Sequence, residues 1–208
     1  MAAGDPRFRY FFAFRPNAGL AARLAALAVA AGQDRRRVRT DRLHLTLCVI
    51  GETLVRDPFL AARARAALTG AGLASFPIGL GRIGGGPGGA AARAIGWRDG
   101  IQGFYRALVR RIAGHGLAPI YRMSGLRPHV TLGYDPCAFE PFTIRHEWFP
   151  DELLLIESEL GRTIHNVVCR WPLSPPLQGL LQFDDGASPT SAAVVAARAW
   201  SRAGSRRS

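Results

Sequence analysis

Two short segments of the sequence carry the same pair of chemically active side chains in the same apolar frame. His44 and Thr46 lie in Leu-His-Leu-Thr-Leu, and His129 and Thr131 lie in Pro-His-Val-Thr-Leu. Side chains of an extended strand alternate between its faces, so each histidine shares a face with its threonine, about 7 Å away. One such pair arises easily by chance, but two matched pairs predict a single composite site.

The two pairs suit displacement at a phosphodiester. One neutral imidazole can take a proton from an attacking water, and a second, protonated imidazole can give a proton to the departing oxygen. Threonine hydroxyls can donate hydrogen bonds to the non-bridging phosphate oxygens as charge builds there. Such a site needs no metal and no cofactor, and we expect neither. The alternative, that the histidines pack and the threonines only favour strands, leaves the repetition unexplained.

Other candidate motifs are weaker. Three further histidines stand alone, without ligand spacing, and are expected outside the site: His115, His146 and His165. Cys48 is expected to be buried as a small apolar residue, and the three cysteines suggest neither a disulfide framework nor a zinc site. Residues 79–84 match Gly-x-Gly-x-x-Gly, but four of the next five residues are glycine and the other is proline, so the segment predicts a hairpin loop and not a dinucleotide site.

Apolar periodicity and the positions of glycine and proline predict an α+β protein. Helices are expected at about residues 18–31, 58–69 and 102–115, and strands at about 8–14, 43–50, 76–83, 92–98, 142–148, 153–160 and 163–172, besides the second motif strand. The last three strands look like a closing meander. Each motif strand follows a strand and a helix, so we expect two pseudo-symmetric lobes of antiparallel strands with helices, facing an open central groove.

Composition places limits on the class of protein. The chain has 208 residues and a net charge of +12, enough for one globular domain and attractive to phosphate backbones. Its basic residues are all arginine, and several crowd residues 35–42 before the first motif. No apolar stretch approaches the roughly 20 residues that span a bilayer, and we expect a cytoplasmic monomer. Residues 1–173 are expected to form the domain, and residues 174–208 a low-complexity tail.

The motif residues resemble those of the two-histidine (2H) phosphoesterase superfamily, and within it the bacterial RNA 2′,3′-cyclic phosphodiesterases once called 2′-5′ RNA ligases. The similarity runs from about residue 8 to residue 173 and includes residues 10–14, 43–52 and 127–133. It implies hydrolysis of a terminal 2′,3′-cyclic phosphate on RNA to a 2′-phosphate. By analogy, His129 would activate water and His44 would protonate the leaving oxygen, and Thr46 and Thr131 would hold the phosphate; swapped roles for the histidines stay open.

The sequence says less about which residues at the rim of the groove contact the substrate. Many relatives have a basic residue shortly after the second motif, where this chain has Tyr134. Arg127 lies two residues before His129, as Arg42 does before His44, and is proposed as a second phosphate contact. Stacking of a terminal base is an alternative role for three aromatic residues that are otherwise expected in the core: Tyr10, Phe12 and Trp97.

Three alternative functions stay open. The same residues would serve a 2′-5′ RNA ligase or a phosphodiesterase for small cyclic nucleotides. A non-catalytic RNA-binding module is a third alternative, but it would have no need for both an acid and a base. The expected substrates are therefore RNA ends or small cyclic nucleotides.

Overall fold

The computed structural model describes residues 7–96, 100–121, 127–162 and 164–176, so Trp97 lies outside the described residues. The described residues form three α-helices and eight strands. The helices are α1 (Ala18–Ala30), α2 (Pro58–Leu68) and α3 (Ile101–Ala113), and a 3-10 turn, η1 (Thr40–Arg42), precedes the first motif. The strands are β1 (Phe8–Phe14), β2 (Leu45–Thr53), β3 (Ile78–Gly84), β4 (Ala90–Ile95), β5 (His129–Gly133), β6 (Phe142–Trp148), β7 (Glu152–Glu159) and β8 (Ile164–Pro172).

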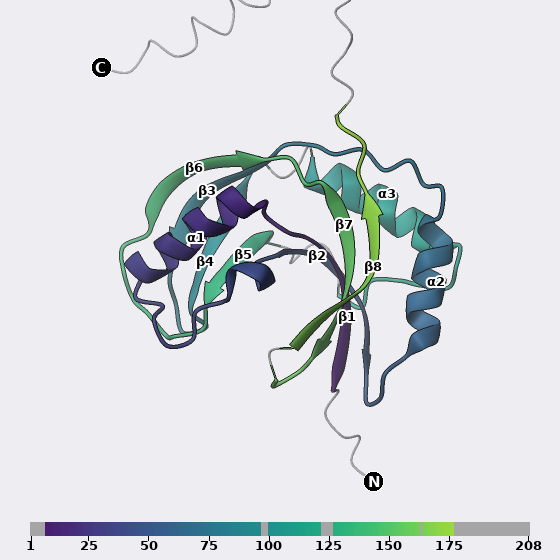
Figure 1. Ribbon diagram of the computed structural model, residues 1–208, viewed down its shortest axis with the longest axis horizontal. Coiled ribbons are helices and arrows are strands. Elements are labelled where there is room, and N and C mark those ends of the chain that lie inside the picture. Colours follow the sequence, from purple (N-terminus) through teal and green to yellow (C-terminus); the bar gives the residue numbers. More distant parts are fainter. Residues whose placement is uncertain (1–6, 97–99, 122–126, 163, 177–208) are drawn as a thin grey trace, which may run out of the picture. The chain divides into compact units, whose positions relative to one another are not determined.

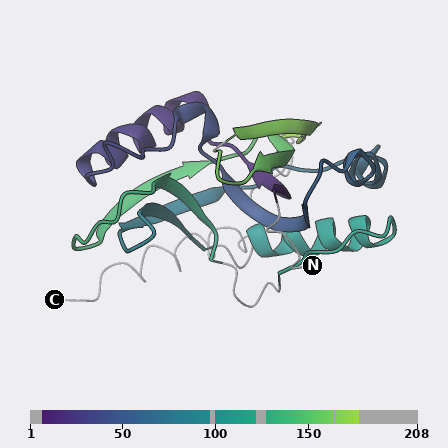
Figure 2. The ribbon, with the colours of Figure 1, turned by 90° about the horizontal axis from the view of Figure 1, so that it is seen from below.

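The strands make one antiparallel sheet in the order β6-β3-β4-β5-β2-β1-β7-β8. The motif strands β2 and β5 are neighbours at its centre, with three strands outside each. Each follows a strand and a helix, as β1-α1-β2 and β4-α3-β5. The helix α1 covers the β3–β6 half, and α2 and α3 cover the other half (Figures 1 and 2). The α+β fold with two similar halves is confirmed, and the two halves share one sheet.

Helix starts follow from local sequence. The side chain of Asn17 accepts a hydrogen bond from the Leu20 N–H at 2.9 Å, and that of Asp57 accepts one from the Leu60 N–H at 3.0 Å. Each satisfies an N–H group that has no partner within the helix. Pro58 follows Asp57 at the first position of α2, where a missing N–H costs nothing.

The first strand separates the core from the site. Tyr10, Phe12 and Phe14 are buried in the main core, whereas Phe11 and Ala13 point to the opposite face of the sheet and pack with two residues of β7. This alternation confirms core packing for Tyr10 and Phe12. The face that carries Phe11 is the one on which the first motif displays its side chains.

The sequence predicts that the last three strands form a meander, and this prediction is wrong. The strand β6 pairs with β3 at one edge of the sheet, and β7 pairs with β1 and β8 at the other. Alternation identified each segment as a strand but carries no information about which distant strand it pairs with. The pairing of β7 with β1 places the β7–β8 hairpin beside the first motif.

The end of the described chain is anchored to the domain. The Ser174 N–H donates to the Leu73 carbonyl at 2.9 Å, and the Ser174 carbonyl accepts from the Ser75 N–H at 2.8 Å. The chain therefore stays on the domain at least one residue past the expected boundary at residue 173. Among the described helices, none has the length and apolar character needed to cross a lipid bilayer.

Candidate active site

The two motifs meet where the halves of the sheet join. Leu45 of β2 pairs with Val130 of β5 in antiparallel register. Continuing this register places His44 opposite Thr131 and Thr46 opposite His129. His44, Thr46 and Thr131 line one pocket, and the charge of His129 acts on His44, so all four side chains that the sequence singled out come together.

Both histidine rings are anchored in the same way. Nδ1 of His44 lies 2.7 Å from the Arg42 carbonyl oxygen, and Nδ1 of His129 lies 2.7 Å from the Arg127 carbonyl oxygen. A carbonyl oxygen only accepts, so both Nδ1 atoms carry the proton and donate it. Both rings are thereby oriented, and Nε2 of each is left to exchange a proton with a substrate.

The two histidines differ in their surroundings. His44 is half-buried and His129 is exposed. Burial lowers the pKa of His44, the charges of Arg15 and His129 lower it further, and the hydrogen bond to the Arg42 carbonyl opposes them. Because a buried charge is poorly solvated, the neutral form of His44 is favoured in the ligand-free protein.

A pocket of about 420 Å³ lies over the first motif. The described residues that line it come from both motifs, from β1 and β2, from the β7–β8 hairpin and from the segments that flank the second motif strand: His44, Thr46, Thr131, Arg9, Phe11, Val49, residues 158–161, His165, Arg36 and Tyr134. His129 is not among the described residues that line it, but His129 lies two residues before Thr131 and its charge acts on His44.

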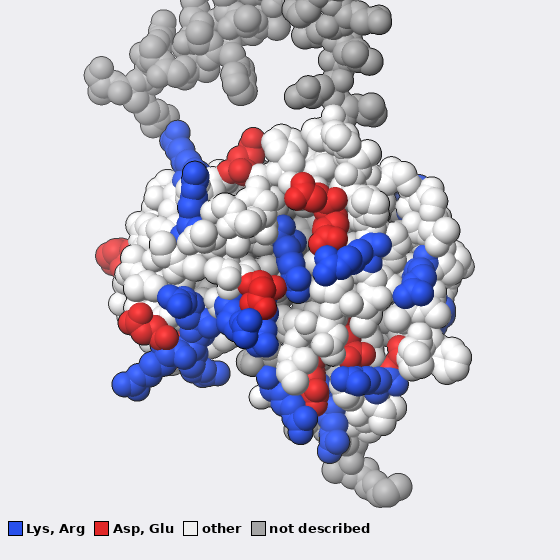
Figure 3. Space-filling view, in the orientation of Figure 1, with Lys and Arg blue, Asp and Glu red and all other residues white. Residues whose placement is uncertain are grey.

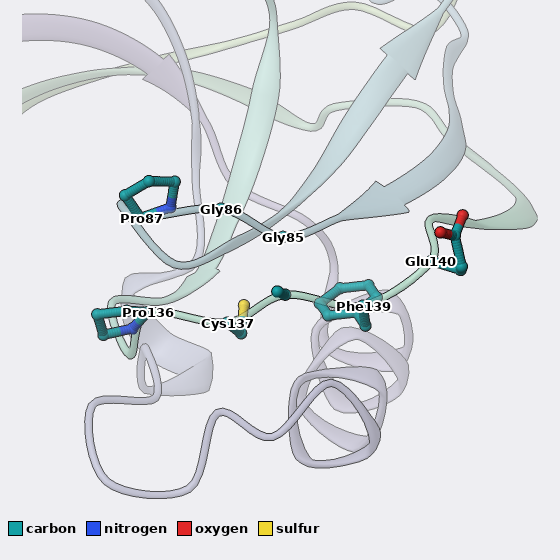
Figure 4. A pocket seen from close by; sticks show the side chains of 8 residues that line it. Gly85, Gly86, Pro87, Pro136, Cys137, Phe139 and Glu140 are labelled. Carbon is teal, nitrogen blue, oxygen red and sulfur yellow. The ribbon is translucent and has the colours of Figure 1, made fainter.

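A larger hollow, of about 890 Å³, lies between the β3–β4 turn and the loop before β6 (Figure 4). The described residues that line it are glycines, prolines, Cys137, Ala138, Phe139 and Glu140. Among these, none is a histidine or a threonine, and Glu140 alone is charged. The candidate catalytic side chains therefore line the smaller pocket and not this hollow.

A bulge in β2 decides which residues follow Thr46 into the pocket. Thr46 pairs with Ala13 and Cys48 pairs with Phe12, so Leu47 is the extra residue. The bulge shifts the alternation by one, which turns Cys48 into the core and Val49 toward the pocket. Cys48 is buried, as expected, and burial raises the pKa of its thiol to about 12.

A third histidine, His165, belongs to this site although the sequence placed it outside. Its ring packs edge-on against His44, with ring centroids 5.1 Å apart, and against Phe11 at 6.0 Å. His165 faces Ser158 across the β7–β8 hairpin, and Ser158 faces Arg9 of β1. A lone histidine carries no motif, so only the long-range pairing of β7 with β1 reveals its position.

His165 should make stability depend on pH. Burial, and then the charges of His44, Arg42 and Arg15, lower its pKa from 6.5 to about 4. Between these values the unfolded chain binds a proton that the folded protein does not, so the free energy of unfolding falls as the pH is lowered from 6.5 to 4. We expect His165→Phe to remove this contribution. The free energy of unfolding, measured by urea unfolding at several pH values across that range, should then change less steeply with pH.

The control for this test is His115→Phe, because His115 is exposed beyond the end of α3. That variant should keep the slope of the parent protein. A His165→Phe variant with an undiminished slope would show that His165 titrates alike in the folded and unfolded states.

Two remaining expectations concern Arg127 and metal ions. The backbone carbonyl of Arg127 anchors His129, while its side chain is exposed and is not among the described residues that line the pocket. Its role as a phosphate contact stays a prediction.

No group of three or more histidine, cysteine or acidic side chains among the described residues is placed to hold a metal ion.

Comparison with known proteins finds similarity at the level of structure. No protein-family model and no curated protein sequence matches the chain. Escherichia coli LigT complexed with 3′-AMP is 24% identical, with 81% of this chain and 99% of that chain covered and a TM-score of 0.60. TT0787 of Thermus thermophilus is 20% identical over 80% and 98%, with a TM-score of 0.64. A phosphoesterase structure is 24% identical over 82% and 99%, with a TM-score of 0.58.

These structures are matched over 98–99% of their own length by about four fifths of this chain. The chain therefore has the α+β fold of LigT and of these neighbours, which is the fold that the resemblance to two-histidine phosphoesterases implies.

Proposed function

We propose that the protein hydrolyses a terminal 2′,3′-cyclic phosphate on RNA to a 2′-phosphate, without a metal ion. The observation that carries the proposal is the matched pair of histidines, each anchored through Nδ1 to the carbonyl two residues earlier, in two motifs whose strands pair at Leu45 and Val130. That LigT was crystallised with 3′-AMP and with phosphate supports a ligand of this chemistry.

The reaction needs two proton transfers. Water attacks phosphorus, the bond from phosphorus to the ribose 3′ oxygen breaks, and the 2′ ester bond stays. One histidine takes the proton of the water through Nε2, and the other gives a proton to the 3′ oxygen, which leaves as a hydroxyl. Thr46 and Thr131 donate hydrogen bonds to the non-bridging oxygens, which stabilises the charge that grows there.

The environment of His44 favours the swapped assignment of roles. The resemblance makes His129 the base, yet the lowered pKa of His44 favours the neutral ring that a base requires. A nitrophenyl phosphodiester separates the roles, because nitrophenolate leaves without a proton. Alanine in place of the acid should cost much less activity on this substrate than on a cyclic phosphate, whereas alanine in place of the base should cost a similar factor on both.

The direct test is an assay of the purified protein with a short RNA that ends in a 2′,3′-cyclic phosphate, in the presence of EDTA. Mass spectrometry and comparison with 2′- and 3′-phosphate standards identify the product. We expect a 2′-phosphate, formed at least about 10²-fold more slowly by His129→Ala. An intact cyclic end, or a reaction that EDTA stops, would overturn the proposal.

A further inference from the structure

The arginine-rich segment before the first motif is attached to the end of the second motif strand. The Val38 N–H donates to the Leu132 carbonyl at 2.9 Å, and the Tyr134 N–H donates to the Arg36 carbonyl at 3.1 Å. The carboxylate of Asp135 accepts the backbone N–H groups of Arg35 and Arg36 at 3.1 and 2.8 Å. These bonds hold the backbone at Arg36 beside the motif.

The buried side chain of Gln33 completes this attachment. Its amide donates to the Asp135 carbonyl and accepts from the Asp135 N–H, both at 3.0 Å. A Cβ atom at Gly133 would collide with Gln33, so glycine is required where the two segments touch. The arginine segment is therefore built into the site and is not a loosely solvated loop.

The Arg36 side chain is held over an aromatic ring at the pocket. Its guanidinium lies 5.9 Å from the centre of the Tyr134 ring, a cation–π arrangement. Both residues line the pocket together with His44, Thr46 and Thr131, and both are exposed, which places them at the rim.

Charge balance distinguishes Arg36 from the other lining residues. Arg9 is paired with Glu52 at 2.6 Å, and Glu159, the acidic lining residue, is paired with Arg162 at 3.1 Å. Arg36 forms no ion pair with a carboxylate among the described residues. Asp135 lies next to Arg36 but accepts backbone N–H groups, so it fixes the segment and leaves the guanidinium free to bind an anion.

Further basic residues lie next to Arg36 in the chain, between α1 and the first motif. A third cavity, of about 430 Å³, is lined by Arg35, Arg37 and Arg39, with Asp34, Asp41, Thr40 and Ala25. Figure 3 shows basic side chains gathered over the segment that follows α1. A single phosphate would need only the site between the motifs, whereas a strand with several phosphates would also be attracted by these neighbouring arginines.

We infer that Arg36, held by Tyr134, binds the phosphodiester that joins the terminal nucleotide of an RNA strand to its 5′ neighbour. The inference rests on the proposed function and narrows its substrate to a strand end in preference to a cyclic mononucleotide. Arg36 is then a substrate-binding residue, and the reacting phosphate is left to the histidines and threonines.

The test compares a dinucleotide that ends in a 2′,3′-cyclic phosphate with a nucleoside 2′,3′-cyclic phosphate. Loss of a charge-assisted contact should lower kcat/KM of Arg36→Ala for the dinucleotide roughly 10- to 100-fold, and for the mononucleotide less than about 3-fold. Arg36→Lys should restore part of the loss, since a lysine also carries the charge but lacks the planar guanidinium. Arg110→Ala, an exposed arginine on α3, is the control with the same change in net charge.

Equal losses on both substrates, or no loss on the dinucleotide, would overturn the inference. Binding measured by calorimetry separates this outcome from failure of the proposed function. A dinucleotide with a terminal 3′-phosphate should bind Arg36→Ala more weakly than the parent protein, and 3′-AMP should bind both alike. This readout requires no catalysis, so it tests Arg36 even if the cyclic phosphate is not hydrolysed.

Discussion

Replacing His129 or His44 with alanine should lower kcat for the cyclic phosphate by roughly 10² to 10⁴, the usual contribution of a positioned acid or base. The two rings are held by the same kind of hydrogen bond, to the carbonyl two residues earlier, so the losses should be of similar size. Because the two proton transfers belong to one displacement, the double variant should be little worse than the poorer single variant.

His129→Ala is the cleaner of the two experiments, because His129 is exposed and its removal leaves no cavity. His44 packs against Phe11 and His165, so His44→Ala needs a parallel thermal unfolding measurement. His115→Ala serves as the control for removal of a histidine. If both motif variants kept most of the kcat of the parent protein, general acid–base catalysis by this pair would be excluded.

Removal of the threonine hydroxyls should have the next largest effect. Thr46→Val and Thr131→Val keep the branched shape of the side chain, and each should lower kcat about 10²-fold, as loss of one donor to a developing oxyanion does. Thr46→Ser and Thr131→Ser keep the hydroxyl and should stay within about 10-fold of the parent protein. Steady-state kinetics on the cyclic dinucleotide measures these changes.

The matched control is Thr143→Val, at an exposed position on the edge strand β6. Equal effects at Thr46 and Thr131 would agree with their related places across the β2–β5 junction. Loss of activity in both the serine and the valine variants would show that packing, and not hydrogen bonding, is the role of the threonines.

The local part of this structure followed from short stretches of sequence. Strand alternation placed His44 with Thr46 and His129 with Thr131, and side-chain caps and helical spacing located the three helices to within a few residues. Both depend on interactions between residues close in the chain. A pattern of this kind predicts which face of a strand is chemical, and here it identified four residues that the structure brings together.

Tertiary structure decided the remainder. The register of Leu45 with Val130, the contact of His165 with His44, and the place of Arg36 over Tyr134 each join segments far apart in the sequence. A strand pattern does not name its partner, and a lone histidine or a run of arginines looks the same on any surface. The paired motifs by themselves determined the candidate chemistry, whereas the third histidine and the basic rim became visible only once the β7–β8 hairpin and residues 33–38 were packed beside them.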